Sequence, residues 1–297
     1  MGAQAKRFGG LIAAFAVAFV GGGIWYFLNG GFGPRQTVHA GKGVAIEIEE
    51  LSFYNSRSEK ITGKVYRPAS DTTRHFPVLV FCPGLGTSAK VYESYYKDFA
   101  SSGMVLYAFD FRGGAPDGKS TSLTLKEMTL GTEMDDLETV LKAIRDVRYV
   151  DRHRVFVLGA SQGALVAALV AARHKELMRA LILLYPAFNI PDRVRELYPR
   201  ARDIPDSAEF AGNMLGKAYF KEAHSLNPYK KIRKFDKEVL ILHGSADNLV
   251  LPSVSSKADS IYRNSELVMI EGSGHGFSGK DRKLATETII SFISDNL

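Results

Sequence analysis

A serine lies between two glycines at the point where one apolar segment ends and another begins. Residues 155–158, Val-Phe-Val-Leu, are typical of a strand buried on both faces. Residues 164–172 are small and apolar, as expected of a packed helix. The sequence between them, Gly-Ala-Ser-Gln-Gly at 159–163, has the G-x-S-x-G pattern of a nucleophile elbow, a tight turn that exposes the serine hydroxyl. We therefore predict that Ser161 is a nucleophile, and the alternative is a glycine-rich corner with an inert serine.

A serine hydroxyl is a poor nucleophile unless a neighbouring base accepts its proton. Of the seven histidines, His275 is the best placed, because it follows a predicted strand at 266–271 on a loop whose glycines let the ring reach inward. His243 lies inside another predicted strand and is more consistent with core packing. We therefore predict that His275 is the base.

The base in turn needs an acid that orients the imidazole and stabilises its charged form. Asp247 ends the predicted strand at 238–247, and the next predicted strand, at 266–271, leads to His275. The chain order is then Ser161, Asp247, His275, which is the order that accompanies a nucleophile elbow of this kind. Asp110 and Glu271 also lie at strand ends and are the alternative acids.

Acyl transfer also requires hydrogen-bond donors where negative charge develops on the substrate oxygen. The backbone N–H of Gln162 opens the helix after the serine and supplies one donor. The segment Cys-Pro-Gly-Leu-Gly at 82–86 follows another apolar strand, and its glycines let the Leu85 N–H turn toward the serine. We therefore predict an oxyanion hole formed by Leu85 and Gln162, with Cys82 as a core residue.

The elements that must position these residues alternate along the chain from Val44 onward. Segments 44–53 and 60–68 alternate apolar with polar residues, which predicts an antiparallel edge with one wet face. The later apolar segments are nearly continuous and are separated by amphipathic helical patterns. This arrangement predicts the α/β class, a mostly parallel doubly wound sheet with helices on both faces and ligands at the carboxyl ends of the strands.

The alternation is interrupted between residues 189 and 236, after the sixth predicted strand, and we interpret this stretch as a short lid over the site. It carries more Lys and Arg than Asp and Glu, which suggests a preference for substrates or surfaces with negative charge. A solvated face is the alternative. Its large apolar residues are candidates for an acyl pocket, although packing of the lid explains them equally well: Tyr198, Met214, Leu215, Tyr219 and Phe220.

The N-terminal residues 1–43 are expected to form a membrane anchor and a flexible tether ahead of a hydrolase domain at 44–297. Residues 8–28 carry no charge, and that length spans a bilayer core as a helix. Positive charges precede this stretch, so the N-terminus is expected in the cytoplasm and the hydrolase domain outside it. A signal peptide cleaved after Ala40, which would release a secreted protein, is the alternative.

The composition limits the class of protein further. The chain has 297 residues with a formal net charge of +6, and no basic stripe interleaved with aromatics, so we expect no nucleic-acid partner. Its single cysteine excludes a disulfide within the chain and a cysteine-based metal site. The oligomeric state is not indicated by any of these patterns.

Five segments, taken in order, resemble the α/β-hydrolase superfamily, specifically the bacterial cinnamoyl/feruloyl-esterase-like and serine-aminopeptidase-like hydrolases. They are CPGLGTS, YAFDFRGGAPDGKST, GASQGA, LHGSADNLV and GSGHGF, and the resemblance covers about Glu47 to Leu297. It implies an α/β-hydrolase fold and an esterase of short acyl or aromatic esters that uses the triad and oxyanion donors named above. Many relatives have His-Gly at the oxyanion turn where this chain has Pro83-Gly84, which preserves the backbone role but no side-chain role.

The residues and the resemblance together predict a serine hydrolase that cleaves carboxylic esters through an acyl-enzyme. The expected substrate is a small-molecule or lipid-like ester, and no metal or organic cofactor is implied. A peptidase or thioesterase could use the same triad. A ligand-binding protein built on a hydrolase fold is the alternative from a different class.

Overall fold

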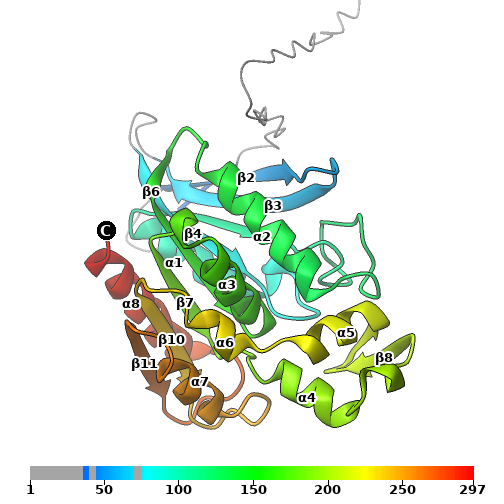
Figure 1. The fold of residues 1–297 in the computed structure, drawn as a ribbon. Helices are drawn as coiled ribbons and strands as arrows, with labels where there is room; N and C mark the ends of the chain where they lie inside the picture. Colours follow the sequence, from blue (N-terminus) through cyan, green and yellow to red (C-terminus); the bar gives the residue numbers. More distant parts are fainter. Residues whose placement is uncertain (1–35, 40–44, 70–74) are drawn as a thin grey trace, which may run out of the picture.

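The computed structural model describes residues 36–39, 45–69 and 75–297, and within these ranges the fold is built on one large sheet (Figure 1). The sheet has nine described strands, of which β1, β2 and β3 are antiparallel to their neighbours and the other six run parallel. This confirms the predicted mostly parallel sheet with an antiparallel edge. In spatial order the strands are β1 (Gln36–His39), β2 (Ala45–Tyr54), β3 (Lys60–Pro68), β5 (Val105–Phe109), β4 (Phe76–Cys82), β6 (Val150–Ala160), β7 (Ala180–Leu184), β10 (Val239–Gly244) and β11 (Ser265–Ile270).

The central strands are apolar throughout because both faces of the sheet are covered. In β4, Val78 and Val80 point into one core, whereas Leu79 and Phe81 point into the other. All four side chains are at most 1% exposed. The absence of polar alternation in this segment therefore reflects two hydrophobic layers rather than a helix.

Each face of the sheet is covered by a separate set of helices (Figure 1). Helices α1 (Glu93–Ser101) and α8 (Gly279–Asp295) pack into the core that contains Leu79, with Ala285, Ile289 and Ile293 of α8 buried at four-residue spacing. The other face is covered by α2 (Leu130–Ile144), α3 (Gln162–Arg173), α6 (Pro228–Ile232) and α7 (Pro252–Asp259). Two short 3₁₀ helices, η2 (Ala89–Tyr92) and η3 (Lys175–Leu177), complete the connections of this body.

The insertion at 189–236 contains short helices and a β-hairpin. Its elements are α4 (Ile190–Leu197), the 3₁₀ helix η4 (Ala201–Asp203), β8 (Ser207–Phe210), β9 (Asn213–Gly216), α5 (Lys217–Ser225) and α6. The hairpin turns at Ala211 and Gly212, both with positive φ, the conformation that a two-residue hairpin loop requires. In Figure 1 the insertion lies to one side of the sheet, next to the end of α2.

Part of the segment predicted as a tether belongs to the sheet. Residues Gln36–His39 form β1 and pair with the start of β2, from Gln36 opposite Ile48 to His39 opposite Ala45. No helix in the three described ranges is long and apolar enough to cross a membrane. The predicted span at residues 8–28 lies outside the described residues.

Candidate active site

Ser161 occupies a strained turn between β6 and α3. Its φ of 53° and ψ of −117° lie outside the usual regions for a residue with a side chain. A side chain at Gly163 would overlap the carbonyl oxygens of Cys82 and Pro83, and one at Gly159 would overlap the first turn of α3. Both glycines of the pattern are therefore required sterically, because the end of β4 passes directly against Gly163 and the first turn of α3 against Gly159.

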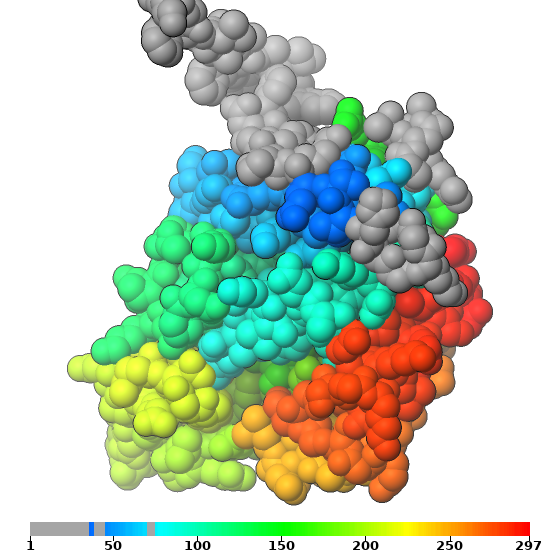
Figure 2. Space-filling model, turned by 180° about the vertical axis from the view of Figure 1, so that it is seen from behind, coloured from blue at the N-terminus to red at the C-terminus, as the bar shows by residue number. Residues whose placement is uncertain are grey.

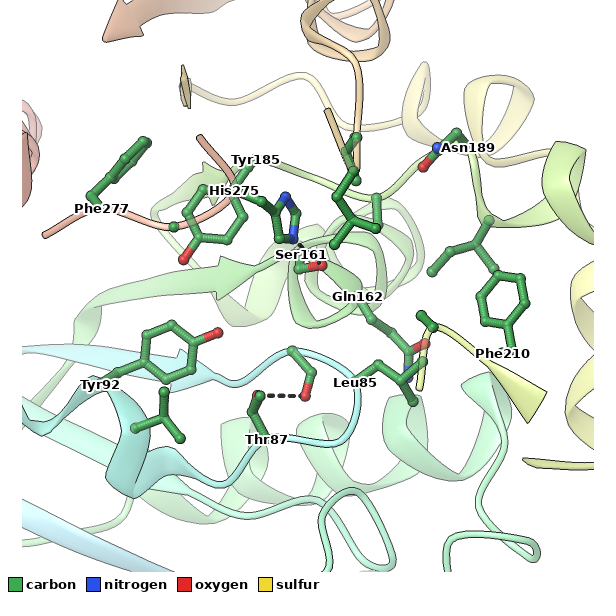
Figure 3. A pocket seen from close by; sticks show the side chains of 18 of the residues that line it. Leu85, Thr87, Tyr92, Ser161, Gln162, Tyr185, Asn189, Phe210, His275 and Phe277 are labelled. Carbon is green, nitrogen blue, oxygen red and sulfur yellow. Dashed lines mark hydrogen bonds between the residues drawn. The ribbon is translucent and has the colours of Figure 1, made fainter. Parts of the chain in front are cut away.

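The structure brings Ser161, His275 and Asp247 together in a chain of hydrogen bonds, of which Figure 3 shows the contact between His275 and Ser161. The Nε2 atom of His275 lies 3.0 Å from Ser161 Oγ, and its Nδ1 lies 2.7 Å from Asp247 Oδ2. Asp247 is 1% exposed, and its other oxygen accepts the N–H groups of Leu249 and Val250, each at 2.9 Å. The carboxylate is thus held by the backbone on one side and faces the imidazole on the other.

A second histidine, His243, contacts the same carboxylate oxygen from the interior. Its Nδ1 lies 2.6 Å from Ser255 Oγ, and its Nε2 lies 2.8 Å from the Val250 carbonyl oxygen and 3.2 Å from Asp247 Oδ2. Because a carbonyl only accepts, Nε2 carries the proton and donates. Burial lowers the pKa of His243, so it is a neutral donor beside the acid. His243 is a buried core residue, as predicted, but its contact with Asp247 was not predicted, and its spacing four residues before Asp247 was the available signal.

The alternative acids lie away from His275 and have other roles. Asp110 accepts the backbone N–H groups of Ala89 and Lys119, each at 2.7 Å, and so anchors two loops. Glu271 is exposed on the turn after β11. The arrangement of the described residues therefore pairs His275 with Asp247.

The predicted oxyanion donors flank the serine. An added Cβ on Gly84 would lie 3.3 Å from Ser161 Cβ, so the turn that carries Leu85 touches the elbow. Among the described residues, neither the Leu85 N–H nor the Gln162 N–H donates to an acceptor. The loop is fixed by Thr87 Oγ1, which donates to the Gly84 carbonyl at 2.8 Å (Figure 3). Two unused backbone donors beside a serine hydroxyl can bind a developing oxyanion.

A cavity of about 590 Å³ opens onto Ser161 and His275. Tyr185, which follows β7, packs its ring edge-on against His275 with 4.7 Å between ring centroids (Figure 3). It is buried and has a φ of 37°, an unfavourable conformation for a tyrosine that the surrounding structure must maintain. Tyr185 was not predicted as a site residue, because backbone strain leaves no pattern in the sequence.

The cavity is enclosed by segments that are far apart in the chain. Residues after β4, the insertion and the loop around His275 all contribute to its wall. Seen from behind, the yellow-green insertion, the cyan segment that follows β4 and the orange-red C-terminal segment border one another (Figure 2).

The structure places none of the five candidate acyl-pocket residues on the cavity wall. Tyr219 and Phe220 are fully buried inside the insertion, where Tyr198 packs edge-on against Phe220. Met214 is 44% exposed on the hairpin, and Leu215 is buried. The insertion instead contributes Asn189, Ile190, Arg193, Phe210 and Ala211.

A buried polar chain connects the insertion to the elbow. Tyr219 donates to Gln162 Oε1 at 2.7 Å, and Gln162 Nε2 donates to Glu133 Oε2 at 2.9 Å. All three residues are at most 1% exposed. Burial raises the pKa of Glu133 to about 8, so at neutral pH this carboxyl is mostly protonated. The side chain of Gln162 is therefore held from both sides, while its backbone N–H donates to no acceptor among the described residues.

Within the described part of the chain, no group of His, Cys, Asp or Glu residues is arranged to hold a metal ion. Cys82 is a free, buried thiol, and burial raises its pKa well above the ordinary value, so it remains an unreactive thiol in the core.

Two family models match this chain. Residues 91–297 match the prolyl oligopeptidase family, and residues 42–128 match platelet-activating factor acetylhydrolase, isoform II. The first match contains Ser161, Asp247 and His275, and it covers more than half of the chain.

Among curated proteins, the chain is similar to dipeptidyl-peptidase 5 of Porphyromonas gingivalis, at 22% identity over 67% of this chain and 29% of that protein. It is also similar to esterase FrsA of Yersinia enterocolitica, at 28% identity over 51% of this chain and 35% of that protein. The chain spans about a third of the length of these relatives.

Solved structures share the fold. Est1E from Butyrivibrio proteoclasticus, solved with ferulic acid, has a TM-score of 0.68 at 23% identity, covering 84% of this chain and 96% of that one. The acetyl xylan esterase from Paenibacillus sp. R4 has a TM-score of 0.65 at 17% identity, covering 89% and 88%. These likenesses confirm the predicted α/β-hydrolase fold. The predicted resemblance is supported by the family match and by the similarity to esterase FrsA.

Proposed function

The chain belongs to the prolyl oligopeptidase family, and from this premise we propose that it is a serine hydrolase that cleaves carboxylic esters through an acyl-enzyme. The observation that carries the proposal is the hydrogen-bonded chain from Ser161 Oγ to His275 at 3.0 Å and from His275 to Asp247 at 2.7 Å. Two free N–H groups lie beside it, at Leu85 and Gln162. The likeness to esterase FrsA supports an ester as the substrate.

In the proposed reaction, His275 accepts the proton of Ser161 as Oγ attacks the ester carbonyl carbon. The carbonyl oxygen becomes an oxyanion and is bound by the N–H groups of Leu85 and Gln162. His275 then donates the proton to the leaving alcohol, and a water molecule repeats the sequence on the acyl-enzyme. Asp247 stabilises the charged imidazole in both halves of the reaction.

A peptidase is the second candidate, and the likeness to dipeptidyl-peptidase 5 favours it. The same side chains would attack an amide carbonyl, but the leaving amine requires protonation before it departs. Comparing 4-nitrophenyl esters with dipeptidyl 4-nitroanilides distinguishes the two candidates. Turnover of the anilides alone would replace the esterase proposal with the peptidase one.

The direct test is labelling by a fluorophosphonate, which forms a covalent bond with an activated serine. We expect the full chain to be labelled and to hydrolyse 4-nitrophenyl esters. Ser161→Ala should abolish both, with little effect on the unfolding midpoint, because only one hydroxyl is removed. Ester turnover that persists in Ser161→Ala would contradict the proposal. The matched control is Ser94→Ala, another cavity serine outside the proposed triad.

We also propose that residues 8–28 anchor the hydrolase domain, residues 44–297, to a membrane on the side away from the cytoplasm. The uncharged stretch and the positive charges before it support this proposal. Membrane fractionation of the full chain tests it. Release of a shortened soluble protein would favour the cleaved signal instead.

A further inference from the structure

The cavity beside Ser161 carries one permanent charge. The described residues of its wall are mostly apolar and aromatic, with hydroxyl and amide groups, and include no carboxylate. Apart from the titratable His275, Arg193 of α4 is the one described ionisable cation that lines it. Of the basic residues in the described insertion, Arg193 alone therefore lies on the cavity wall.

Arg193 is held in place by stacking rather than by an ion pair. Its guanidinium carbon lies 5.3 Å from the ring centroid of Phe210, another residue of the cavity wall. In the described part of the chain, no carboxylate forms an ion pair with Arg193. The neighbouring Arg195 differs, because it pairs with Asp192 at 2.5 Å and donates to the carbonyls of His224 and Leu226.

These contacts leave the guanidinium N–H groups without an anionic partner in a mostly apolar cavity. The stacked ring restricts the side chain, so less conformational entropy is lost when it binds a ligand. An anion there gains from the reduced screening near apolar walls. The Phe210 ring is 4% exposed, because the Arg193 guanidinium lies over it and Tyr219 and Phe220 pack against it.

We propose that Arg193 is a specificity-determining residue that selects esters carrying a second, negatively charged group. This inference rests on the proposed esterase function. A carboxylate and a phosphate both match the planar donor set of a guanidinium, so the shared feature of the substrate is an oxyanion group away from the scissile bond.

Two matched pairs of substrates test the inference with the full chain. The carboxylate pair is the 4-nitrophenyl monoester of adipate against 4-nitrophenyl hexanoate, which have six-carbon acyl groups. The phosphate pair is hexanoyl glycerol phosphate against hexanoyl glycerol. The measured quantity is the ratio of kcat/KM for the anionic ester to kcat/KM for the neutral ester, because a general loss of activity cancels in the ratio.

We expect Arg193→Met to lower this ratio by roughly 10- to 100-fold for at least one pair, as expected for loss of a charge-assisted contact. Arg193→Lys should restore part of it, because the charge remains but the planar stacking is lost. The control is Arg202→Met, which removes the same charge from an exposed position on η4 and should leave the ratio unchanged.

The outcomes separate this inference from the proposed function. Absence of turnover for every ester would overturn both. Turnover of the neutral esters, with ratios that are the same in wild type and Arg193→Met, would overturn the role of Arg193 and leave the esterase proposal intact. Equal losses in Arg193→Met and Arg202→Met would show a general effect of charge and also overturn it. Whichever pair loses its preference identifies the anionic group.

Discussion

Glu133 is expected to make the stability of the protein depend on pH, and Glu133→Gln should remove that dependence. The carboxyl lies on α2, is 1% exposed and accepts a hydrogen bond from Gln162 Nε2 at 2.9 Å. It forms no ion pair among the described residues. Burial raises its pKa from the ordinary 4.5 to about 8, because a charged carboxylate there would lose its hydration.

The magnitude follows from proton linkage. Between pH 4.5 and pH 8 the folded state holds a proton on Glu133 that the unfolded state releases, so stability falls as the pH rises. Each pH unit in this window costs about 1.4 kcal/mol. The free energy of unfolding should therefore fall by roughly 4 kcal/mol between pH 5 and pH 8 through this group alone.

Glutamine has the same shape and cannot ionise, and its carbonyl oxygen can accept the Gln162 hydrogen bond. Urea unfolding of the wild type and Glu133→Gln at several pH values between 5 and 8 gives the difference in unfolding free energy at each pH. We expect the variant to gain stability relative to the wild type as the pH rises, by an amount approaching that loss.

The control is Glu127→Gln, which changes an exposed carboxyl just before α2. Hydrogen bonds from the backbone and side chain of Thr124 lower the pKa of Glu127, so its contribution has the opposite sign. A difference between wild type and Glu133→Gln that stays constant from pH 5 to pH 8 would refute the reasoning, because Glu133 would then titrate alike in both states.

Two further predictions concern the elbow and the acid. Gly163→Ala should lower the free energy of unfolding by roughly 1–3 kcal/mol, because the new methyl group overlaps the Cys82 and Pro83 carbonyls; an unchanged thermal midpoint would contradict this close approach. Asp247→Asn should lower kcat for ester hydrolysis by roughly 10³- to 10⁴-fold, because an amide cannot stabilise the charged imidazole; steady-state kinetics check it, and a loss below tenfold would argue against Asp247 as the acid.

The sheet could be predicted from local patterns. In β4 both faces are covered, so its apolar residues are continuous, whereas β2 and β3 alternate apolar with polar residues. Consecutive residues of one strand are enough to show which of these patterns it has. The hairpin β8–β9 was missed, because its strands have four residues each and mix small, polar and apolar types. Strands this short are specified by their surroundings more than by their sequence.

The positions of Ser161, Asp247 and His275 could be predicted because each lies within five residues of the end of a strand, and parallel strands end at one edge of a sheet. The residues of the insertion that line the cavity could not be predicted. Phe210 and Tyr219 are both aromatic residues of the insertion, yet one lines the cavity and the other is buried against Gln162. Their sequence surroundings do not distinguish them.

Local patterns were enough to predict the order of the strands and helices outside the insertion, the glycines of the elbow and the residue types available for chemistry. The three-dimensional structure was needed to see which insertion residues face the cavity, that Glu133 is buried beside Gln162, and that His243 shares the carboxylate of Asp247. Periodicity reports burial only relative to adjacent residues, so it could not predict these contacts. The direction of a side chain in an irregular insertion depends on packing against residues far away in the chain, as Tyr219 does against Gln162, 57 positions earlier.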